Sequence, residues 1–102
     1  MEGASNQESA ERISKEQVIE SLRQNPENIS LLDRYLIEQK KEIRDSRGEL
    51  DLNIELAEIY RDAGSLDAAY EAFLDAGDQA RQERDDALAD KLFAEAEKLV
   101  IE

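Results

Sequence analysis

The 102-residue chain contains no cysteine, no histidine and no tryptophan. The lack of cysteine excludes disulfides, thiolate metal sites and thiol nucleophiles, and the lack of histidine excludes acid–base catalysis by imidazole. An enzyme built from this sequence would have to rely on carboxylates, lysine, tyrosine or serine. The sequence shows no nucleophile paired with a base and no glycine-rich phosphate loop. We therefore expect no catalytic residue, no cofactor and no enzymatic activity.

Long apolar runs are also missing. Tyr35–Ile37 and Leu99–Ile101 are typical of the longest ones, whereas a helix that spans a bilayer needs about 20 apolar residues. The first twelve residues, MEGASNQESAER, have neither the basic start nor the apolar centre of a secretory signal. We expect a cytoplasmic protein with no membrane partner.

Basic side chains are scarce relative to acidic ones. The chain has 13 Lys and Arg against 26 Asp and Glu, which gives a net charge of −13. Residues 1–49 carry −3 of this charge and residues 50–102 carry −10. Such a field repels phosphate backbones, so nucleic acid is not an expected partner. The charge favours a basic protein segment, although acidic side chains also keep a small domain soluble without any partner.

Two acidic stretches have some features of metal sites. Residues 51–55 alternate oxygen-bearing side chains, but a calcium loop also needs a Gly at its sixth position and a Glu at its twelfth, and both are missing. Asp85, Asp86 and Asp90 could gather a cation weakly, yet acidic residues are equally expected in the first turn of a helix. We predict no metal ligand.

The chain length suits one small domain. Apolar periodicity predicts an all-α fold with no strand: a disordered tail over residues 1–13, then a single domain over 14–102 with helices at about 15–24, 26–44, 50–63, 66–82 and 86–101. Ser14 and Gln17 have the form of a capping box. Asn25 and Pro26 are expected to end the first helix and begin the second. Gly48 is expected to lie in the break after the second helix.

Residues 56–73, LAEIYRDAGSLDAAYEAF, predict two antiparallel helices joined by a tight turn. Gly64 is expected to end the third helix and Ser65 to cap the fourth. Small residues allow the two backbones to approach closely, and large residues fill the remaining space. Gly77 weakens the second half of the fourth helix by up to about 1 kcal/mol relative to Ala. The sequence leaves open whether the helix bends there.

The spacing in this stretch resembles the tetratricopeptide repeat, a helix-turn-helix of 34 residues. The matching positions, expected to pack the repeat together, are Leu56, Ala57, Tyr60, Gly64, Ala69, Phe73 and Ala76. Asn53 replaces the early Trp of the family, and Arg81 replaces its closing Pro. The match gives one repeat, at about residues 50–82, which is a third of the chain. Whether residues 14–45 form a second, diverged repeat stays open.

The resemblance implies a right-handed stack of antiparallel hairpins. Because one repeat cannot bury both of its faces, the first two helices should pack on one side of the hairpin, and the last helix should cap the other side. Tyr60 matches a packing position and is expected in the core. Tyr35 is expected either in the core or stacked on a partner.

In this family, the first helices of successive hairpins line a concave groove that binds a segment of another protein. By analogy, the candidate partner-binding residues are Ile54, Glu55, Glu58, Arg61 and Asp62. Some members hold a peptide carboxylate with Lys and Asn, but this chain has acidic side chains at most comparable positions. We therefore expect a basic, apolar or amphipathic partner segment. Two alternatives remain: the same residues form a solvated face, or the chain is a structural subunit that forms homo-oligomers through its helical faces.

Overall fold

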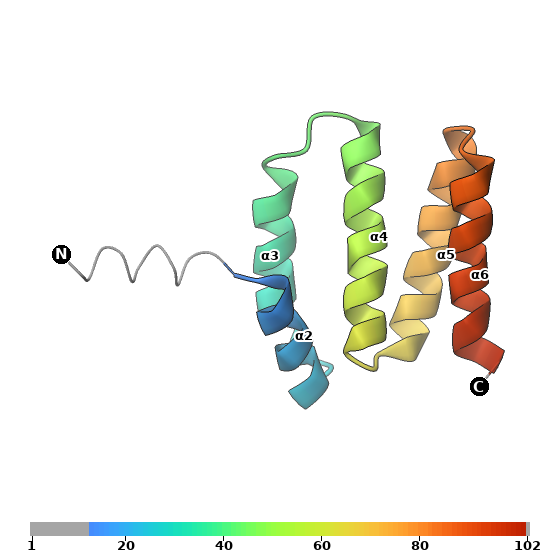
Figure 1. The fold of residues 1–102 in the computed structure, drawn as a ribbon. Helices are drawn as coiled ribbons and strands as arrows, with labels where there is room; N and C mark the ends of the chain where they lie inside the picture. The colour runs from blue at the N-terminus through green and yellow to red at the C-terminus, as the bar shows by residue number, and fades with distance from the viewer. Residues whose placement is uncertain (1–12, 102) are drawn as a thin grey trace.

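The computed structural model describes residues 13–101, and within that range it contains five α-helices and no strand. The all-α class is therefore confirmed. The helices are α2 (Lys15–Gln24), α3 (Ser30–Lys40), α4 (Ser46–Asp62), α5 (Leu66–Gln82) and α6 (Asp86–Ile101). Consecutive helices run in opposite directions, with α4 between the α2–α3 pair and the α5–α6 pair (Figure 1). The tail predicted for residues 1–13 lies outside the described residues, apart from Ile13, which packs against the first helices.

The first helix begins as the sequence predicts, but the second does not. The backbone N–H of Gln17 donates to Ser14 Oγ at 3.1 Å, and the Ser14 N–H donates to Gln17 Oε1 at 2.9 Å, which completes the capping box. Asn25 then ends α2, and its Oδ1 accepts from the Glu27 N–H at 3.2 Å. Because this bond stabilises a turn, α3 begins at Ser30 and the prediction of a helix from Pro26 is wrong.

The link between α3 and α4 also differs from the prediction. α3 ends at Lys40 rather than near 44, and α4 begins at Ser46 rather than near 50. The Asp45 backbone is extended, and its carboxylate Oδ1 accepts from the Gly48 N–H at 3.0 Å. Asp45 is therefore the N-cap of α4, and this cap places Gly48 inside the first helical turn instead of after a helix.

The two turns in the second half of the chain share one geometry, twenty positions apart. Gly64 lies between α4 and α5 with φ +86°, and Arg84 lies between α5 and α6 with φ +65°. In each turn the next residue's N–H donates at 2.9 Å to a carbonyl five positions back, which is the bond that closes a Schellman motif. The predicted role of Gly64 is confirmed, and Arg84 adopts the same left-handed backbone without being a glycine.

The caps that follow these two turns differ. Ser65 is the N-cap of α5 as predicted, but its side chain makes no capping hydrogen bond. Asp85 holds the corresponding position before α6, and its Oδ1 accepts from the Leu88 N–H at 3.2 Å. The negative side chains of Asp67 and Asp86 lie in the first turns of α5 and α6, where the helix dipole favours them.

Helix α4 contributes to two separate cores. The N-terminal core consists of Val18, Leu22, Leu32, Tyr35, Ile59 and Ala63, with Leu56 and Tyr60 partly buried against it. The C-terminal core consists of Leu50, Ala57, Phe73, Ala76, Ala80, Ala89, Leu92 and Ala96. The expected arrangement is confirmed, since α2 and α3 pack on the α4 side of the α4–α5 hairpin while α6 packs on its α5 side. Of the residues expected to pack the repeat, some pack with the C-terminal core (Ala57, Phe73, Ala76) and others against the N-terminal core (Leu56, Tyr60). Ala69 is buried outside both clusters, and Gly64 is exposed in the turn.

Helix α5 continues through Gly77, and the Phe93 side chain of α6 occupies the space that a side chain at this position would need. A Cβ atom at Gly77 would lie 2.6 Å from Cε1 of the Phe93 ring. The Arg81 guanidinium carbon lies 4.9 Å from the centre of the same ring, which adds a cation–π contact. Gly77 therefore lets α6 approach α5 closely.

The left-handed backbone at Arg84 makes Arg84→Gly a stabilising change. An L-residue in this conformation costs about 1–2 kcal/mol, and glycine avoids that cost but loses part of it to extra freedom in the unfolded chain. We expect the free energy of unfolding to rise by about 0.5–1 kcal/mol in urea denaturation. Gly64→Ala is the matched control, because an added Cβ meets no atom within 4 Å. Gly64→Ala should destabilise the protein only because Ala tolerates the positive φ of this position poorly. A Gly64→Ala variant that is more stable than the original would contradict this account.

The close contact at Gly77 predicts that Gly77→Ala destabilises the protein although Ala is the better helix former. Overpacking typically costs about 1–3 kcal/mol, which exceeds the gain of up to about 1 kcal/mol in helix propensity. Thermal unfolding measures the difference. Adding Phe93→Leu, which removes the ring that a methyl group would strike, should recover part of the loss. A Gly77→Ala protein more stable than the original would show that the contact is not limiting.

Candidate interaction groove between α4 and α6

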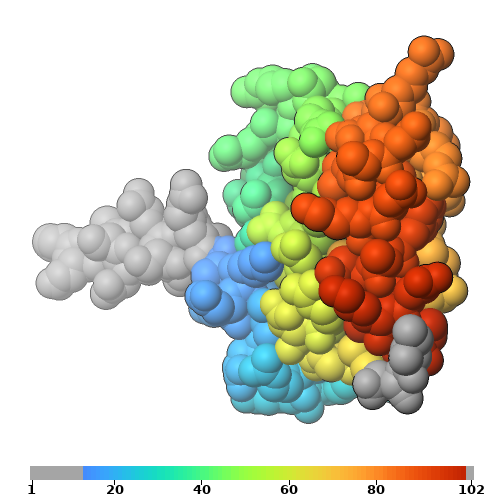
Figure 2. Space-filling model, turned by 45° about the vertical axis from the view of Figure 1, so that its right-hand side comes forward, coloured from blue at the N-terminus to red at the C-terminus, as the bar shows by residue number. Residues whose placement is uncertain are grey.

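A groove of about 350 Å³ lies between α4 and α6. Within the described residues, no Cα atom of α4 lies within 8 Å of one of α6, so side chains rather than backbones bound the space. Figure 2 shows atoms of α4 exposed between α2 and α6. The lining residues come from three helices: Ile54, Glu58 and Arg61 of α4, Phe73 of α5, and Leu88, Lys91, Leu92 and Glu95 of α6. We refer to this space as the α4–α6 groove.

The floor of the α4–α6 groove is apolar. Phe73 and Leu92 are 1% and 4% exposed and belong to the C-terminal core. Ile54 and Leu88 are half-buried and pack against that core from the two sides. An apolar side chain from another molecule would therefore cover the partly exposed faces of Ile54 and Leu88 and lose its own contact with water.

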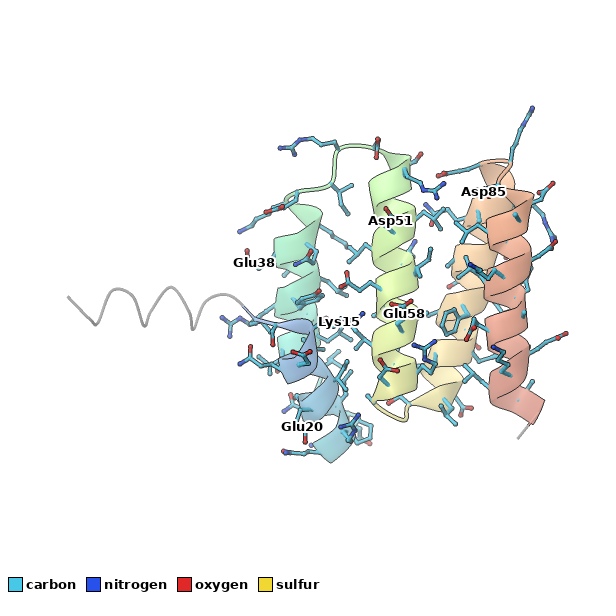
Figure 3. All side chains as sticks on the ribbon, viewed as in Figure 1. Lys15, Glu20, Glu38, Asp51, Glu58 and Asp85 are labelled. Atoms are coloured by element: carbon cyan, nitrogen blue, oxygen red, sulfur yellow. The ribbon has the colours of Figure 1, made fainter. Side chains whose placement is uncertain are left out.

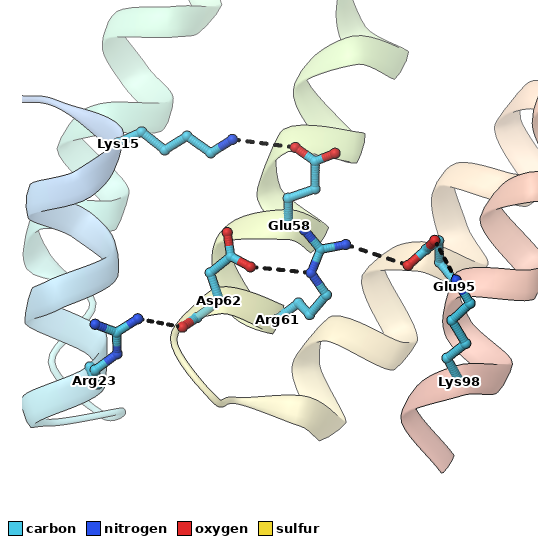
Figure 4. Close-up of polar contacts among 7 residues, drawn as sticks. All are labelled: Lys15, Arg23, Glu58, Arg61, Asp62, Glu95 and Lys98. Carbon is cyan, nitrogen blue, oxygen red and sulfur yellow. Dashed lines mark hydrogen bonds and ion pairs between the residues drawn. The ribbon is translucent and has the colours of Figure 1, made fainter. Parts of the chain in front are cut away.

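Two ion pairs span the gap between α4 and α6. Near the start of α4, Arg47 Nη1 lies 3.1 Å from Asp85 Oδ2, which precedes α6. Further along both helices, Arg61 Nη1 donates to Glu95 Oε1 at 3.4 Å (Figure 4). Since both pairs are partly exposed, each stabilises the protein by at most about 1 kcal/mol. They bridge the two helices on either side of the groove, whose spacing follows from the packing of both helices against α5.

Arg61 contacts three side chains at the groove. Besides Glu95, its Nε donates to Asp62 Oδ1 at 3.2 Å, and its guanidinium carbon lies 5.8 Å from the centre of the Phe73 ring. Glu95 also accepts from Lys98 Nζ at 3.2 Å. The rim of the groove therefore carries two acidic and two basic side chains, Glu58 and Glu95 with Arg61 and Lys91. Its local charge is balanced although the whole chain is strongly acidic.

Helix α2 is attached to α4 on the same face. Lys15 Nζ lies 3.3 Å from Glu58 Oε1, and the two side chains point toward one another in Figure 3. At the last residue of α4, the backbone carbonyl of Asp62 accepts from Arg23 Nη2 at 2.7 Å (Figure 4). These contacts place α2 beside the groove and engage Glu58 within the molecule.

The five candidate partner-binding residues do not share one surface. Ile54, Glu58 and Arg61 line the α4–α6 groove. Asp62 lines a different hollow between α2 and the end of α4. Glu55 lies toward α3 instead, where its Oε2 accepts from the Tyr35 hydroxyl at 2.7 Å. One face of α4 thus supplies the groove residues, and Glu55 has a structural contact.

Tyr35 is a core residue of α3. It is 6% exposed, and its hydroxyl is held by Glu55 rather than left free for a partner. Burial raises the pKa of Tyr35 above its ordinary value, and the hydrogen bond to Glu55 and the charge of Glu55 raise it further. Burial also raises the pKa of Tyr60, with a smaller contribution from the negative charge of Asp33. Both phenols therefore stay protonated to a higher pH than an exposed tyrosine.

Sequence reasoning missed the α6 side of the groove, which consists of Leu88, Lys91, Leu92 and Glu95. The apolar spacing of Leu88 and Leu92 was visible in the sequence as the core face of a helix. What the spacing could not show is that this face borders open space next to α4 instead of being fully covered. Within residues 13–101, no three acidic side chains converge as metal ligands would.

A scan of protein-family models and searches of curated proteins and solved structures return no match to this chain. None of the helices in the described range combines the length and apolarity needed to cross a membrane.

The hydrogen bond from Tyr35 to Glu55 predicts a specific dependence of stability on alkaline pH. A raised pKa in the folded state means that the contribution of Tyr35 is complete below its unfolded pKa of about 10 and is lost as pH rises through the folded value. At neutral pH, Tyr35→Phe should lower the free energy of unfolding by about 1 kcal/mol. Above pH 10 its stability should fall less steeply than that of the original protein. Parallel curves in urea denaturation at several pH values would contradict this role of the hydroxyl.

Proposed function

We propose that this chain is a protein–protein interaction module that holds a short segment of another protein in the α4–α6 groove. One observation carries the proposal: a groove with an apolar floor lies between two helices that are bridged by ion pairs. Partly exposed apolar side chains grouped in a concave surface are typical of binding sites. No catalytic role is proposed, and the module would act in the cytoplasm.

The resemblance to tetratricopeptide repeats supports the same surface. In a stack of such hairpins, α2, α4 and α6 would be the first helices and α3 and α5 the second ones. The α4–α6 groove then corresponds to the concave side on which that family binds its partners. Under this proposal α2 and α3 form the diverged unit, and α6 is the capping helix.

The charges support an apolar anchor with basic neighbours as the partner segment. Arg61 and Lys91 balance Glu58 and Glu95 at the rim, so contacts inside the groove favour no charge sign. The net charge of −13 acts over a longer range and favours the approach of basic partners. Apolar contact would therefore supply most of the affinity, while charge would supply selectivity and association rate.

Self-assembly is a second candidate, favoured by two apolar side chains at one end of the α5–α6 pair. Leu66 at the start of α5 is 41% exposed, and Val100 near the end of α6 is 60% exposed. Burying them against another copy would remove apolar area from water, although the net charge of −13 opposes the approach of two copies. Sedimentation at high and low salt separates the candidates, because a monomer under both conditions removes support for self-assembly.

Site-specific photo-crosslinking tests the groove. A photoreactive residue replaces Lys91, which lines the groove, or Glu97, which is exposed on the same helix and outside the lining. In native extract at low salt, we expect the Lys91 position to give a discrete crosslinked partner and the Glu97 position to give none. Equal labelling at both positions, or no labelling at either, would contradict the proposal. Mass spectrometry of the crosslinked peptide then tests for an apolar residue with basic neighbours.

A further inference from the structure

A second groove, of about 470 Å³, lies between α4 and α5. Leu56 and Tyr60 of α4 and Ala68 and Ala72 of α5 form its apolar part. All four are half-buried, so each retains some surface that a partner could cover. We call this surface the α4–α5 groove.

The α4–α5 groove lies on the opposite side of α4 from the α4–α6 groove. A helix turns by about 100° per residue, so Leu56 and Tyr60 lie roughly half a turn around α4 from Ile54 and Glu58. Leu56 and Tyr60 pack against the N-terminal core, whereas Ile54 packs against the C-terminal core. The two grooves therefore share no lining residue and can be altered independently.

The charged residues that line the α4–α5 groove are all acidic. Asp67, Glu71 and Asp75 recur every four residues along α5, and all three are exposed. They form one stripe about 12 Å long, at 1.5 Å of rise per residue. The ion pairs found among residues 13–101 include none of the three, whereas the acidic residues at the α4–α6 groove are paired with Lys15 and Arg61.

The negative potential extends beyond α5. Asp33 of α3 lies close enough to Tyr60 for its charge to act on the phenol. Asp78 continues the exposed acidic stripe toward the end of α5, and the adjoining hollow is lined by Glu49, Asp75, Asp78 and Glu83 without a basic residue. An apolar strip with carboxylates along its length and no basic side chain in its lining is complementary to an amphipathic helix that carries basic residues.

We propose that the α4–α5 groove docks a basic amphipathic helix of a partner protein. Lys or Arg at positions i, i+4 and i+8 of that helix would match the spacing of Asp67, Glu71 and Asp75. Apolar residues on the adjacent face would cover Leu56 and Tyr60. This surface is additional to the α4–α6 groove and does not depend on the function proposed for it.

A second copy of this chain is a poorer occupant than a basic partner. Two copies with a charge of −13 each repel one another. The most basic stretch of the chain, residues 40–47, has four basic residues but also contains Glu42 and Asp45. Asp45 is engaged as the N-cap of α4, and Arg47 is paired with Asp85. A helix with several unopposed basic residues fits the groove better.

The test uses a fluorescein-labelled synthetic helix of roughly 15 residues, long enough to follow the stripe. It carries Lys at i, i+4 and i+8 with Leu and Ala on the adjacent face. Fluorescence anisotropy measures its binding to the full chain. We expect saturable binding that weakens as salt concentration rises. A second peptide of identical composition, with its lysines distributed around the helix, should bind more weakly.

Matched charge variants separate docking from general attraction to an acidic protein. Asp67→Asn combined with Glu71→Gln and Asp75→Asn should weaken peptide binding about tenfold. The control combines Glu16→Gln, Glu27→Gln and Glu97→Gln, which are exposed positions outside the groove and change the net charge by the same amount. It should bind almost as tightly as the original chain. Equal losses in the two triple variants, or no loss in the first, would overturn the proposal.

Two further measurements keep the result interpretable. Circular dichroism and urea denaturation check that the first triple variant is folded, which its three exposed positions lead us to expect. Lys91→Gln, in the α4–α6 groove, should leave peptide binding unchanged. Clearly stronger binding in that variant, which removes a positive charge that would repel a basic peptide from the α4–α6 groove, would place the docking there and contradict the proposal. Oligomers that form in the absence of the peptide would also contradict it, because a second copy would then occupy the surface.

Discussion

Helix α4 must bury apolar side chains in two directions, and the rest of the structure depends on this constraint. Ile59 and Ala63 enter the N-terminal core, and Leu50 and Ala57 enter the C-terminal core. Within residues 13–101, no side chain of α2 or α3 belongs to the C-terminal core, and none of α5 or α6 belongs to the N-terminal core. Helix α4 therefore provides the hydrophobic connection between the two cores. Its two remaining sides border the α4–α6 and α4–α5 grooves. The candidate binding surfaces are therefore consequences of a helix that is packed on two sides and open on the other two.

The sequence predicted those parts of the fold that depend on local chemistry and on regular spacing. The capping box at Ser14, the left-handed turn at Gly64 and the bounds of α2, α5 and α6 all follow from residues within one or two helical turns. Competing local signals caused the errors at α3 and α4. Pro26 suits the first position of a helix, but the Asn25 side chain stabilises a turn there. Gly48 suits a helix end, but the cap from Asp45 draws it into α4.

Other features required the tertiary structure. From the sequence, Gly77 only lowers the helix propensity of α5. The structure shows that the Phe93 ring of α6 lies where a larger side chain at position 77 would stand. Arg84 gave no sign of a left-handed backbone except its position twenty residues after Gly64, in a turn of the same geometry. The candidate binding residues were predicted to share a concave acidic surface. The structure does not form that surface, because Glu55 is hydrogen-bonded to Tyr35 and Glu58 is paired with Lys15. The acidic residues of α5 that make no ion pair line the α4–α5 groove, on the opposite side of α4.

Native-state hydrogen exchange tests most directly whether α4 couples the two cores. Leu22, 1% exposed in the N-terminal core, contacts none of the core residues of α6, and Leu22→Ala should cost about 2–5 kcal/mol. If α4 couples the cores, this change should reduce the protection of the most slowly exchanging amides in α4 and α6 by the same factor, since those amides exchange through global unfolding. Loss of protection confined to α2 and α3, with α6 unaffected, would show that the two halves unfold independently and would contradict the account.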